Sequence, residues 1–315
     1  MILSASRRTD IPAFYSKWFM NRLHEGYVLV RNPFNYHQVS KISLDPAVID
    51  CIVFWTKNAA PMIPYIDEIS SRYKYYFQYS LNGYDRSIEQ NIASLESRIN
   101  TFRTLSEKSG PEKVVWRYDP VLITDNIGIN WHIEQFRVIA SELKGHTKTC
   151  VFSFIDLYDK MKNNVSELGI HACSTDEMKI IASAFSEIAR SNDMVLQTCA
   201  EEIDLGQYGI QHGCCIDKTQ IEKISGRVLH ASKDKNQREA CGCLESIDIG
   251  QYNTCRHGCK YCYANFNPQS VITFSKQHDP NSPFLIGHQE ETDKITERKM
   301  KSLLGEASGQ ISMFI

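Results

Sequence analysis

The regular alternation of apolar, strand-like runs with helical patterns is the feature that most constrains the fold of this chain. Seven runs before residue 200 are predicted to be strands, and an eighth follows near the cysteine-rich end: 2–5, 28–33, 51–58, 73–80, 113–120, 150–156, 194–201 and 246–250. Helical spacing of apolar residues is found between several of them: 14–26, 87–108, 127–145 and 175–192. Apolar strands separated by helices are typical of a parallel sheet covered by helices.

Eight such strands favour an α/β fold of the (β/α)8-like, TIM-type barrel class, with a doubly wound open sheet as the alternative. We expect a single domain with elaborations. Its predicted parts are the main body of the barrel at 1–200, a cysteine-containing insertion at 201–245, the last strand with a cysteine loop at 246–268, and a C-terminal tail at 269–315 with one helix at about 289–304.

The bulk composition sets limits on location and partners. The 315 residues carry a net charge of −2, which gives no sign of a general affinity for nucleic acid or for anionic membranes. No apolar run approaches the ~18 residues that a membrane span needs, and the first ten residues do not resemble an export signal. Together with eleven cysteines, these features predict a cytoplasmic, reduced, metal-binding protein.

Three cysteines form the most distinctive motif. Cys255, Cys259 and Cys262 are spaced C-x3-C-x2-C in the segment CRHGCKYCYAN. Three thiolates can hold three irons of a cubane and leave the fourth iron open to a small molecule. With Tyr261 directly before the third cysteine, the spacing resembles the cluster-binding signature of radical S-adenosylmethionine enzymes. A structural zinc site is the alternative, but zinc knuckles favour C-x2-C pairs.

Charged and amide residues gather where the predicted strands end. In a barrel, the carboxyl ends of the strands carry the functional groups. We therefore expect a polar-substrate cavity, and its arginines suit a carboxylate or a phosphate. The candidates for the chemistry are Arg7, Arg8, Asp10, Lys57, Asn58, Arg117 and Asp119, and further strand-end residues are Arg31, Asn32, Gln78, Asp156 and Glu201.

The other cysteines fall into two groups. Cys51 and Cys150 lie inside apolar strands and are predicted to be core residues, and Cys173 is a small loop residue at a helix entry. The second group surrounds the irregular segment before the C-x3-C-x2-C motif and can complete a four-thiolate site, either an auxiliary iron–sulfur cluster or a structural zinc site. Its members are Cys199, Cys241, Cys243 and one of the adjacent pair Cys214 and Cys215, of which we favour Cys215. A third possibility is that these cysteines are reduced and bind no metal.

Several segments extend the resemblance beyond the cysteine motif. They are SASRRTDIP, VRNPFN, VFWTKN, CAEEIDL, KDKNQREACGC and DIGQYNTCRHGCKYCYAN, and they resemble the uncharacterised family called domain of unknown function 1848 across nearly the whole chain. That family has a C-terminal cysteine cluster similar to the one near the N terminus of radical S-adenosylmethionine enzymes. The resemblance therefore implies a [4Fe-4S] cluster on Cys255, Cys259 and Cys262, and S-adenosylmethionine as the second cofactor. Within the cluster loop, the string CRHGCKYCYA is also similar to the spore photoproduct lyase branch, which acts on DNA.

One departure from the radical S-adenosylmethionine pattern concerns chain order. Those barrels place the cysteine loop after the first strand and a GGE-like motif after the second, whereas here the loop follows the last predicted strand and no GGE appears. We expect a circular permutation in which the strand at 246–250 closes beside 2–5. By this resemblance, Arg7 or Arg8 would hold the methionine carboxylate, Asp10 would accept from its amine, and Tyr261 would contact the adenine.

The leading hypothesis is thus a radical S-adenosylmethionine enzyme that abstracts hydrogen from an unknown small polar or anionic substrate. Its cluster would be reduced by an electron donor such as flavodoxin or ferredoxin. A nucleic acid or nucleotide substrate is the alternative within this class. Two hypotheses come from other classes. The first is a non-catalytic protein whose cysteines bind zinc or an iron–sulfur cluster that stabilises the C-terminal region. The second is a metal-independent barrel enzyme whose active site is formed by the WTKN and RYDP strand ends.

Overall fold

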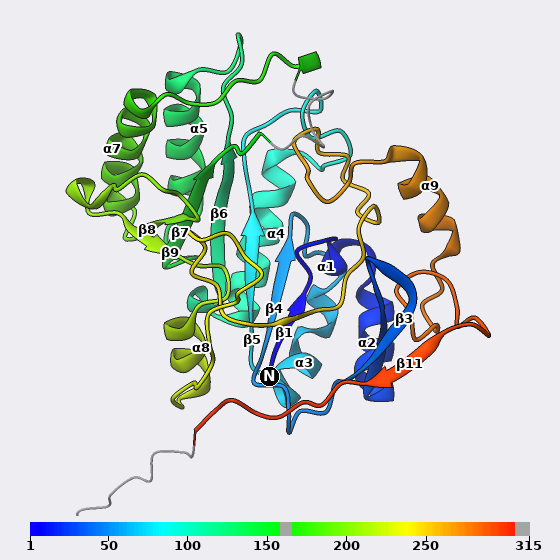
Figure 1. The fold of residues 1–315 in the computed structure, drawn as a ribbon. Helices are drawn as coiled ribbons and strands as arrows, with labels where there is room; N and C mark the ends of the chain where they lie inside the picture. Colours follow the sequence, from blue (N-terminus) through cyan, green and yellow to red (C-terminus); the bar gives the residue numbers. More distant parts are fainter. Residues whose placement is uncertain (158–165, 306–315) are drawn as a thin grey trace, which may run out of the picture.

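The structure is a computed structural model that describes residues 1–157 and 166–305 (Figure 1). Its helices and strands, in chain order, are β1 (Ile2–Ala5), α1 (Ile11–Phe14), α2 (Ser16–Glu25), β2 (Tyr27–Asn32), β3 (Asn35–Ser43), β4 (Cys51–Thr56), α3 (Ile66–Arg72), β5 (Tyr75–Ser80), α4 (Leu95–Ser109), β6 (Val114–Val121), α5 (Ile129–Glu142), β7 (Thr149–Phe154), α7 (Thr175–Ser191), β8 (Val195–Cys199), β9 (Gln211–Gly213), α8 (Lys218–Ser225), β10 (Ile247–Asp248), α9 (Pro268–Gln277) and β11 (Lys294–Glu297).

One large parallel sheet dominates the fold. Its eight strands are hydrogen-bonded in the order β10-β1-β4-β5-β6-β7-β8-β9, and every neighbouring pair is parallel. The α/β class and the parallel sheet predicted from the alternation of strands and helices are therefore confirmed. The short strand β10 pairs with β1 through Leu3 opposite Ile247 and Ser4 opposite Asp248, as the permutation hypothesis expects.

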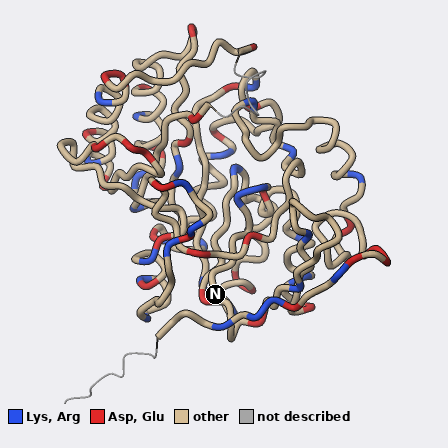
Figure 2. The backbone as a smooth tube through the Cα atoms, viewed as in Figure 1, with Lys and Arg blue, Asp and Glu red and all other residues tan. Residues whose placement is uncertain are grey.

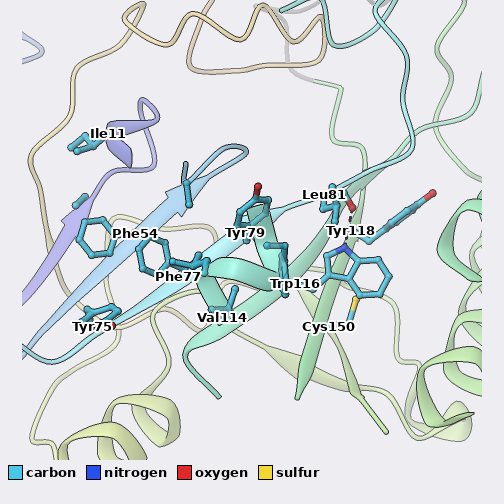
Figure 3. Close-up of a cluster of buried hydrophobic side chains, with 14 of the residues drawn as sticks. Ile11, Phe54, Tyr75, Phe77, Tyr79, Leu81, Val114, Trp116, Tyr118 and Cys150 are labelled. Atoms are coloured by element: carbon cyan, nitrogen blue, oxygen red, sulfur yellow. Dashed lines mark hydrogen bonds between the residues drawn. The ribbon is translucent and has the colours of Figure 1, made fainter. Parts of the chain in front are cut away.

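One face of this sheet is covered by the helices that connect its strands. Alternate strand residues point to this face and form the largest apolar cluster with residues of α2, α3, α4, α5 and α7. Aromatic side chains fill the layer (Figure 3): Phe54 stacks on Phe77 of the next strand with ring centroids 4.7 Å apart, and the Trp116 indole donates to the Leu81 carbonyl. Stacked aromatic pairs of this kind add stabilisation beyond the apolar area that they bury.

The other face of the sheet carries the predicted 201–245 insertion. Inward-pointing residues of the strands, such as Val53, Tyr76 and Val151, pack against Ile216, Ile221 and the cysteines of this segment. In Figure 1 the segment crosses in front of the strands, on the side away from the connecting helices. Among the described helices, α2, α3, α4, α5 and α7 contribute to one apolar cluster on one face of the sheet, whereas Ile221 of α8 packs in the cluster on the other face.

The set of eight strands differs from the predicted one in two places. Residues 28–33 were expected in the main sheet, but β2 forms an antiparallel hairpin with β3, and β11 adds to β3 in a separate three-stranded sheet. The main sheet still has eight strands, because β9, which lies inside the insertion, joins its edge in place of the predicted strand at 28–33. The apolar run of β2 is explained by packing on both of its faces: Leu29 contacts the small cluster of Val39 and Phe284, while Val28 and Val30 pack on the main core.

Two predicted helices also need correction. The helix expected at about 289–304 is wrong, because β11 occupies part of this range and the tail helix is α9, which starts at Pro268 with an Asn267 cap. The helix expected from 87 begins only at Leu95, where Ser94 provides the cap. The predicted stop at Gly26 and the capping by Ser174 are confirmed. The last ten residues of the predicted tail lie outside the described residues.

None of the helices in the described part of the chain combines the length and the apolarity that a membrane span requires. Charged residues of both signs are interspersed along the chain in the view of Figure 2, in keeping with the small net charge.

Candidate functional site

A cavity of about 320 Å³ lies at the carboxyl ends of the sheet strands. Such a volume is typical of a small-molecule site. It brings together all but one of the residues predicted to carry the chemistry or to bind a cofactor or metal. Those that line it are Arg7, Arg8, Asp10, Lys57, Arg117, Asp119, Tyr261 and seven cysteines, namely Cys199, Cys215, Cys241, Cys243, Cys255, Cys259 and Cys262.

The walls of this cavity come from strands that are far apart in the sheet. Arg7 follows β1 and Cys199 ends β8, and five strand-to-strand steps separate these two strands. On a flat sheet with strands ~4.8 Å apart, the two ends would be about 24 Å from each other. Arg7 nevertheless lies near cysteines from the far side of the cavity. Burial lowers the pKa of Arg7, but the charges of the nearby Cys243, Asp248 and Cys215 outweigh the effect of burial and raise this pKa. The sheet is therefore strongly curved around the cavity.

The cysteine loop is held beside β1 by Asp248 at the end of β10. This carboxylate accepts hydrogen bonds from the Ser4 hydroxyl at 2.8 Å and from the backbone N–H of Arg7 at 2.9 Å, and also from the Ser6 hydroxyl. Gly250 is required at the following turn, because a Cβ atom there would lie 2.1 Å from the Ser6 oxygen. The segment 4–10 and the cysteine loop are thus direct neighbours.

The cysteine loop also docks on the loop between β5 and α4. The backbone N–H of Asn91 donates to the His257 carbonyl, and that of Lys260 donates to the Ile88 carbonyl, both at 2.9 Å. Burial raises the pKa of the thiols of Cys255, Cys259 and Cys262. A bound metal would lower these pKa values again, because a thiol that coordinates a metal loses its proton. The donor chemistry of this loop therefore fits a thiolate-bound metal centre.

A buried ion-pair group lies next to Cys259. The carboxylate of Glu89, which is 1% exposed, accepts from Lys57 Nζ at 2.8 Å and lies 3.5 Å from Arg98 Nη1. The Tyr261 hydroxyl donates to the same carboxylate. Burial raises the pKa of Glu89, but the charges of Lys57 and Arg98 outweigh this and lower it. The Lys57 ammonium also lies 5.5 Å from the centre of the Tyr261 ring.

Asp10 is buried and makes several contacts within the protein. Its Oδ1 accepts from the Ala13 N–H and caps α1, while its Oδ2 accepts from the Lys57 N–H and lies 2.7 Å from His257 Nε2. Asp10 thereby ties β1, β4 and the cysteine loop together. Asn58 is the predicted site residue that does not line the cavity; its side chain accepts from the Ala60 N–H in the turn after β4.

The two arginines after β1 lie at the cavity wall. Arg7 Nη2 is 3.8 Å from Asp234, and its guanidinium lies over the Trp55 ring. Arg8 lies over the Tyr252 ring, and it has no ion-pair partner among residues 1–157 and 166–305. The buried Thr9 hydroxyl between Arg8 and Asp10 also lacks a partner among these residues. These groups are free to bind an oxygen-bearing ligand.

Buried Arg117 and partly buried Asp119 form a second ion pair towards the carboxyl end of β6. Arg117 Nε donates to Asp119 Oδ2 at 3.0 Å, and Nη1 lies 3.0 Å from Cys215 Sγ. Cys215 Sγ in turn lies 3.3 Å from Cys199 Sγ. Cys214 does not line the cavity; it contacts Asp217 instead. This arrangement favours Cys215 over its neighbour as a ligand.

The remaining strand-end residues divide between the cavity and other places. Asp156 lines the cavity and pairs with Arg238, and the buried amide of Gln78 donates to the Cys215 carbonyl. Glu201 accepts from the Phe154 N–H, and burial raises its pKa to about 7. Arg31 and Asn32 lie away from the cavity, in the three-stranded sheet, where Arg31 pairs with Asp293.

Sequence reasoning missed Glu89, Asp248 and His257. Glu89 lies in a segment that was expected to be helical, and only the docking of that segment on the cysteine loop reveals its partners. Asp248 and His257 lie in motifs that the sequence does single out. Their roles depend on contacts with β1 and Asp10, and no local spacing encodes those contacts.

Comparison with known proteins gives one finding. The family model described as "Domain of unknown function (DUF1848)" matches residues 2–264, which include the cysteine loop and the whole cavity wall. No curated protein and no solved structure matches the chain.

Proposed function

The chain belongs to the family called domain of unknown function DUF1848, and from this premise we propose that it is a radical S-adenosylmethionine enzyme. In this proposal Cys255, Cys259 and Cys262 hold a [4Fe-4S] cluster with one open iron. The observation that carries the proposal is that all three thiols face the cavity formed by the charged ends of β1, β4 and β6.

The spacing of the three thiols supports a cluster over a single zinc ion. Around one zinc, with Zn–S bonds of about 2.3 Å, tetrahedral sulfur atoms lie roughly 3.8 Å apart. Within the part of the chain that the structure describes, His37, Glu290 and Asp293 alone bring three ligand atoms within 4.8 Å of one another. The three sulfurs of the loop are therefore not all within 4.8 Å of one another, an arrangement that three separate irons of a cubane allow.

The segment after β1 supplies groups that suit the methionine part of S-adenosylmethionine. The Arg8 guanidinium, which has no ion-pair partner among the described residues, can hold a carboxylate, and the Thr9 hydroxyl, which is likewise without a partner there, can bind a polar atom beside it. Arg7 can add a second contact at the cost of its long ion pair with Asp234. Asp10 was expected to accept from the amine, but its present contacts assign it first to positioning the cysteine loop.

When bound, the cluster and S-adenosylmethionine supply a 5′-deoxyadenosyl radical for hydrogen abstraction. The protein's own part is to exclude water and to fix the orientation of the ligands. Tyr261 is locked by its hydrogen bond to the buried Glu89, so that the ring forms a rigid part of the wall next to Cys259. Lys57 is held in its charged form, because the Glu89 carboxylate outweighs the effect of burial and raises the lysine pKa.

We further propose that the curved sheet is the wall of a (β/α)8-like barrel, circularly permuted relative to other radical S-adenosylmethionine barrels. Three observations support this: the one-sided helix layer, the shared cavity at the ends of β1 and β8, and the parallel pairing of β10 with β1. In such a barrel the segment 4–10 would lie beside the cluster loop, in the position that the GGE-like motif occupies in other radical S-adenosylmethionine barrels.

The cavity supports a small polar or anionic substrate. Its volume of about 320 Å³ suits a metabolite, and its lining carries five cationic side chains, namely Arg7, Arg8, Lys57, Arg117 and Arg238. A nucleic acid substrate is the less favoured alternative, since charges of both signs are interspersed along the chain. A flavodoxin or ferredoxin type of donor would reduce the cluster.

The experiment is to purify the protein without oxygen, to reconstitute it with iron and sulfide, and to reduce it in the presence of S-adenosylmethionine. We expect the parent protein to form 5′-deoxyadenosine and Cys259→Ala to form none. Cys173→Ala is the matched control, because Cys173 lies outside the cavity, and it should retain product formation. A cluster-loaded parent protein that forms no product would contradict the proposal.

A further inference from the structure

Four more cysteines line another part of the cavity wall. Cys199 ends β8, Cys215 lies two residues after β9, and Cys241 and Cys243 lie in the loop before β10. All four are buried, and none forms a disulfide. Their sulfur atoms form a row, which we call the thiol row: Cys199 Sγ lies 3.3 Å from Cys215 Sγ, Cys243 is hydrogen-bonded to Cys215, and Cys241 is hydrogen-bonded to Cys243.

The thiol row matches neither of the metal centres that the sequence suggests for these cysteines. Thiolates on different irons of a cubane are held apart by the cluster between them, at about twice the 3.3 Å that separates Cys199 Sγ from Cys215 Sγ. Around one zinc ion all four sulfurs would lie roughly 3.8 Å from one another, whereas no three thiols of the row lie mutually within 4.8 Å in the described structure. The direct contact of two thiols points instead to chemistry between sulfur atoms.

Cys199 and Cys215 are placed to form a disulfide with little movement. A disulfide bond is about 2.05 Å long, so the two sulfurs need to approach by roughly 1.25 Å. Strand pairing sets Cys199 opposite Gly213 of β9. The Cys215 carbonyl accepts from the Tyr76 hydroxyl at 2.6 Å and from the Gln78 amide at 3.0 Å. The backbone on both sides is thus fixed, and the approach is within the reach of side-chain rotation.

The thiols of the row differ in acidity. The hydrogen bond with Cys243 lowers the pKa of Cys241 to about 7. The hydrogen bond with Cys215 and burial raise the pKa of Cys199. In Cys215 and Cys243 one hydrogen bond within the row lowers the pKa, but the other hydrogen bond and burial outweigh it and raise the pKa. Cys241 therefore carries the thiolate that a small oxidant in the cavity meets first.

These differences give the thiol row a direction. In thiol–disulfide exchange a sulfur with a low pKa is the better leaving group, so a disulfide that contains Cys241 passes to the thiols of higher pKa. Arg117 Nη1 lies 3.0 Å from Cys215 Sγ and favours the thiolate that Cys215 needs when it attacks. The exchange ends at the closest pair of sulfurs, which belongs to Cys199 and Cys215.

We propose that the thiol row is an oxidation site, in which hydrogen peroxide that enters the cavity reacts with Cys241 and the oxidation is passed on to form a disulfide between Cys199 and Cys215. The Cys241 thiolate takes one oxygen of the peroxide as a sulfenic acid and releases hydroxide, and the Cys243 thiol then displaces water to form a disulfide. Attack by Cys215 on Cys243, and then by Cys199 on Cys215, moves this bond along the row and restores the displaced thiols. In sum, two thiols and one peroxide give one disulfide and two waters, and an external thiol reductant reverses the change.

The test adds hydrogen peroxide to the fully reduced protein, blocks the remaining thiols with iodoacetamide and maps the peptides by mass spectrometry. Cleavage after Glu201 and Glu202 separates Cys199 from Cys215 in the sequence, so that their disulfide links two peptides. We expect both thiols to be lost to this link and to be recovered on reduction with dithiothreitol. Cys215→Ala should abolish the link, whereas Cys214→Ala, the matched control outside the cavity, should retain it.

The order of the steps has its own readout. Cys241→Ala should slow formation of the disulfide at pH 7 by on the order of tenfold or more, because the other thiols of the row are mostly protonated there. Cys243→Ala should leave a sulfenic acid on Cys241 that dimedone traps, since the next thiol of the row is missing. The parental rate in Cys241→Ala, or a final disulfide between Cys241 and Cys243, would overturn the proposal.

The variant Cys255→Ala/Cys259→Ala/Cys262→Ala keeps the outcome distinct from that of S-adenosylmethionine cleavage. It removes the loop thiols, which also react with peroxide, and it should still form the disulfide between Cys199 and Cys215. If both cysteines stay fully alkylated after excess peroxide, in this variant and in the parent, the oxidation site does not exist. About one zinc per chain in the reduced protein, lost on Cys215→Ala, would equally contradict the proposal, in favour of a structural site. Should Cys215→Ala fail to fold, the peptide map of the parent still decides the question.

Discussion

Glu89 connects the charged wall of the cavity to the cysteine loop. Its buried carboxylate is shared by Lys57, Arg98 and Tyr261, which come from three different parts of the chain. Removing one partner from a buried ion pair is costly, because the other charge remains desolvated. This residue therefore contributes to stability and, at the same time, fixes the position of Tyr261.

Replacement of Glu89 by Gln should lower the free energy of unfolding by about 3–5 kcal/mol, since Lys57 and Arg98 would lose their buried counter-charge. The measurement is urea unfolding followed by circular dichroism. The matched control is Glu187→Gln on the exposed face of α7, which should change the stability by less than about 0.5 kcal/mol. Equal effects of the two substitutions would show that the Glu89 group is not a stabilising element.

At the scale of single residues, the sequence predicts chemistry better than it predicts partners. Strand-end position identified Arg7, Lys57 and Arg117, because polar residues that follow apolar strands of a parallel sheet meet at one edge. Glu89 follows no strand directly, and so nothing local marked it. Asn58 also follows a strand, but its side chain closes a turn instead of facing the cavity.

At the scale of elements, the apolar runs predicted the main sheet well and the small sheet poorly. The strands β1, β4, β5, β6, β7, β8 and β10 coincide with predicted runs to within one residue at their starts and ends or lie inside them, because most of their residues are buried. The strands β3 and β11 are mostly exposed, and β9 has only three residues, so none produces a hydrophobic pattern. The helix predicted near 289–304 failed for the same reason, since pairing with the edge of β3 determines the conformation there.

The junction of β10 with β1 is the element-level contact on which the site depends. Substituting Gly250 by Ala would place a Cβ atom 2.1 Å from the Ser6 oxygen and 3.1 Å from Thr9 Cγ2. We expect the free energy of unfolding to fall by about 1–3 kcal/mol, as in other overpacked sites. Thermal unfolding measures the effect, and reconstituted iron content reports on the adjacent loop.

Gly128→Ala is the control for this substitution. A Cβ atom at Gly128 has no neighbour within 4 Å, and the backbone there does not require glycine. Its effect should stay within about 1 kcal/mol, the size of a change at a helix cap. If Gly250→Ala were as stable as this control and bound iron normally, the tight β10–β1 junction would not be needed to hold the loop.

At the scale of the whole molecule, the order of the strands in space matters more than their order along the chain. The cysteine loop follows β10 near the end of the matched family region, yet it lies next to the first strand of the chain. The curved sheet then brings the ends of β1 and β8 to one cavity, with a group of cysteines on each of two wall regions. Sequence patterns alone indicate both cysteine groups, but only the fold shows that they share a cavity.

The central claim is that the loop of Cys255, Cys259 and Cys262 leaves one iron open to S-adenosylmethionine. The most direct measurement is the electron paramagnetic resonance spectrum of the reduced, reconstituted Cys241→Ala/Cys243→Ala variant, in which the other cysteine group of the cavity is disrupted. We predict that S-adenosylmethionine changes the spectrum of the cluster, because its amino and carboxylate groups bind the open iron directly. A spectrum that is identical with and without saturating S-adenosylmethionine would contradict the account.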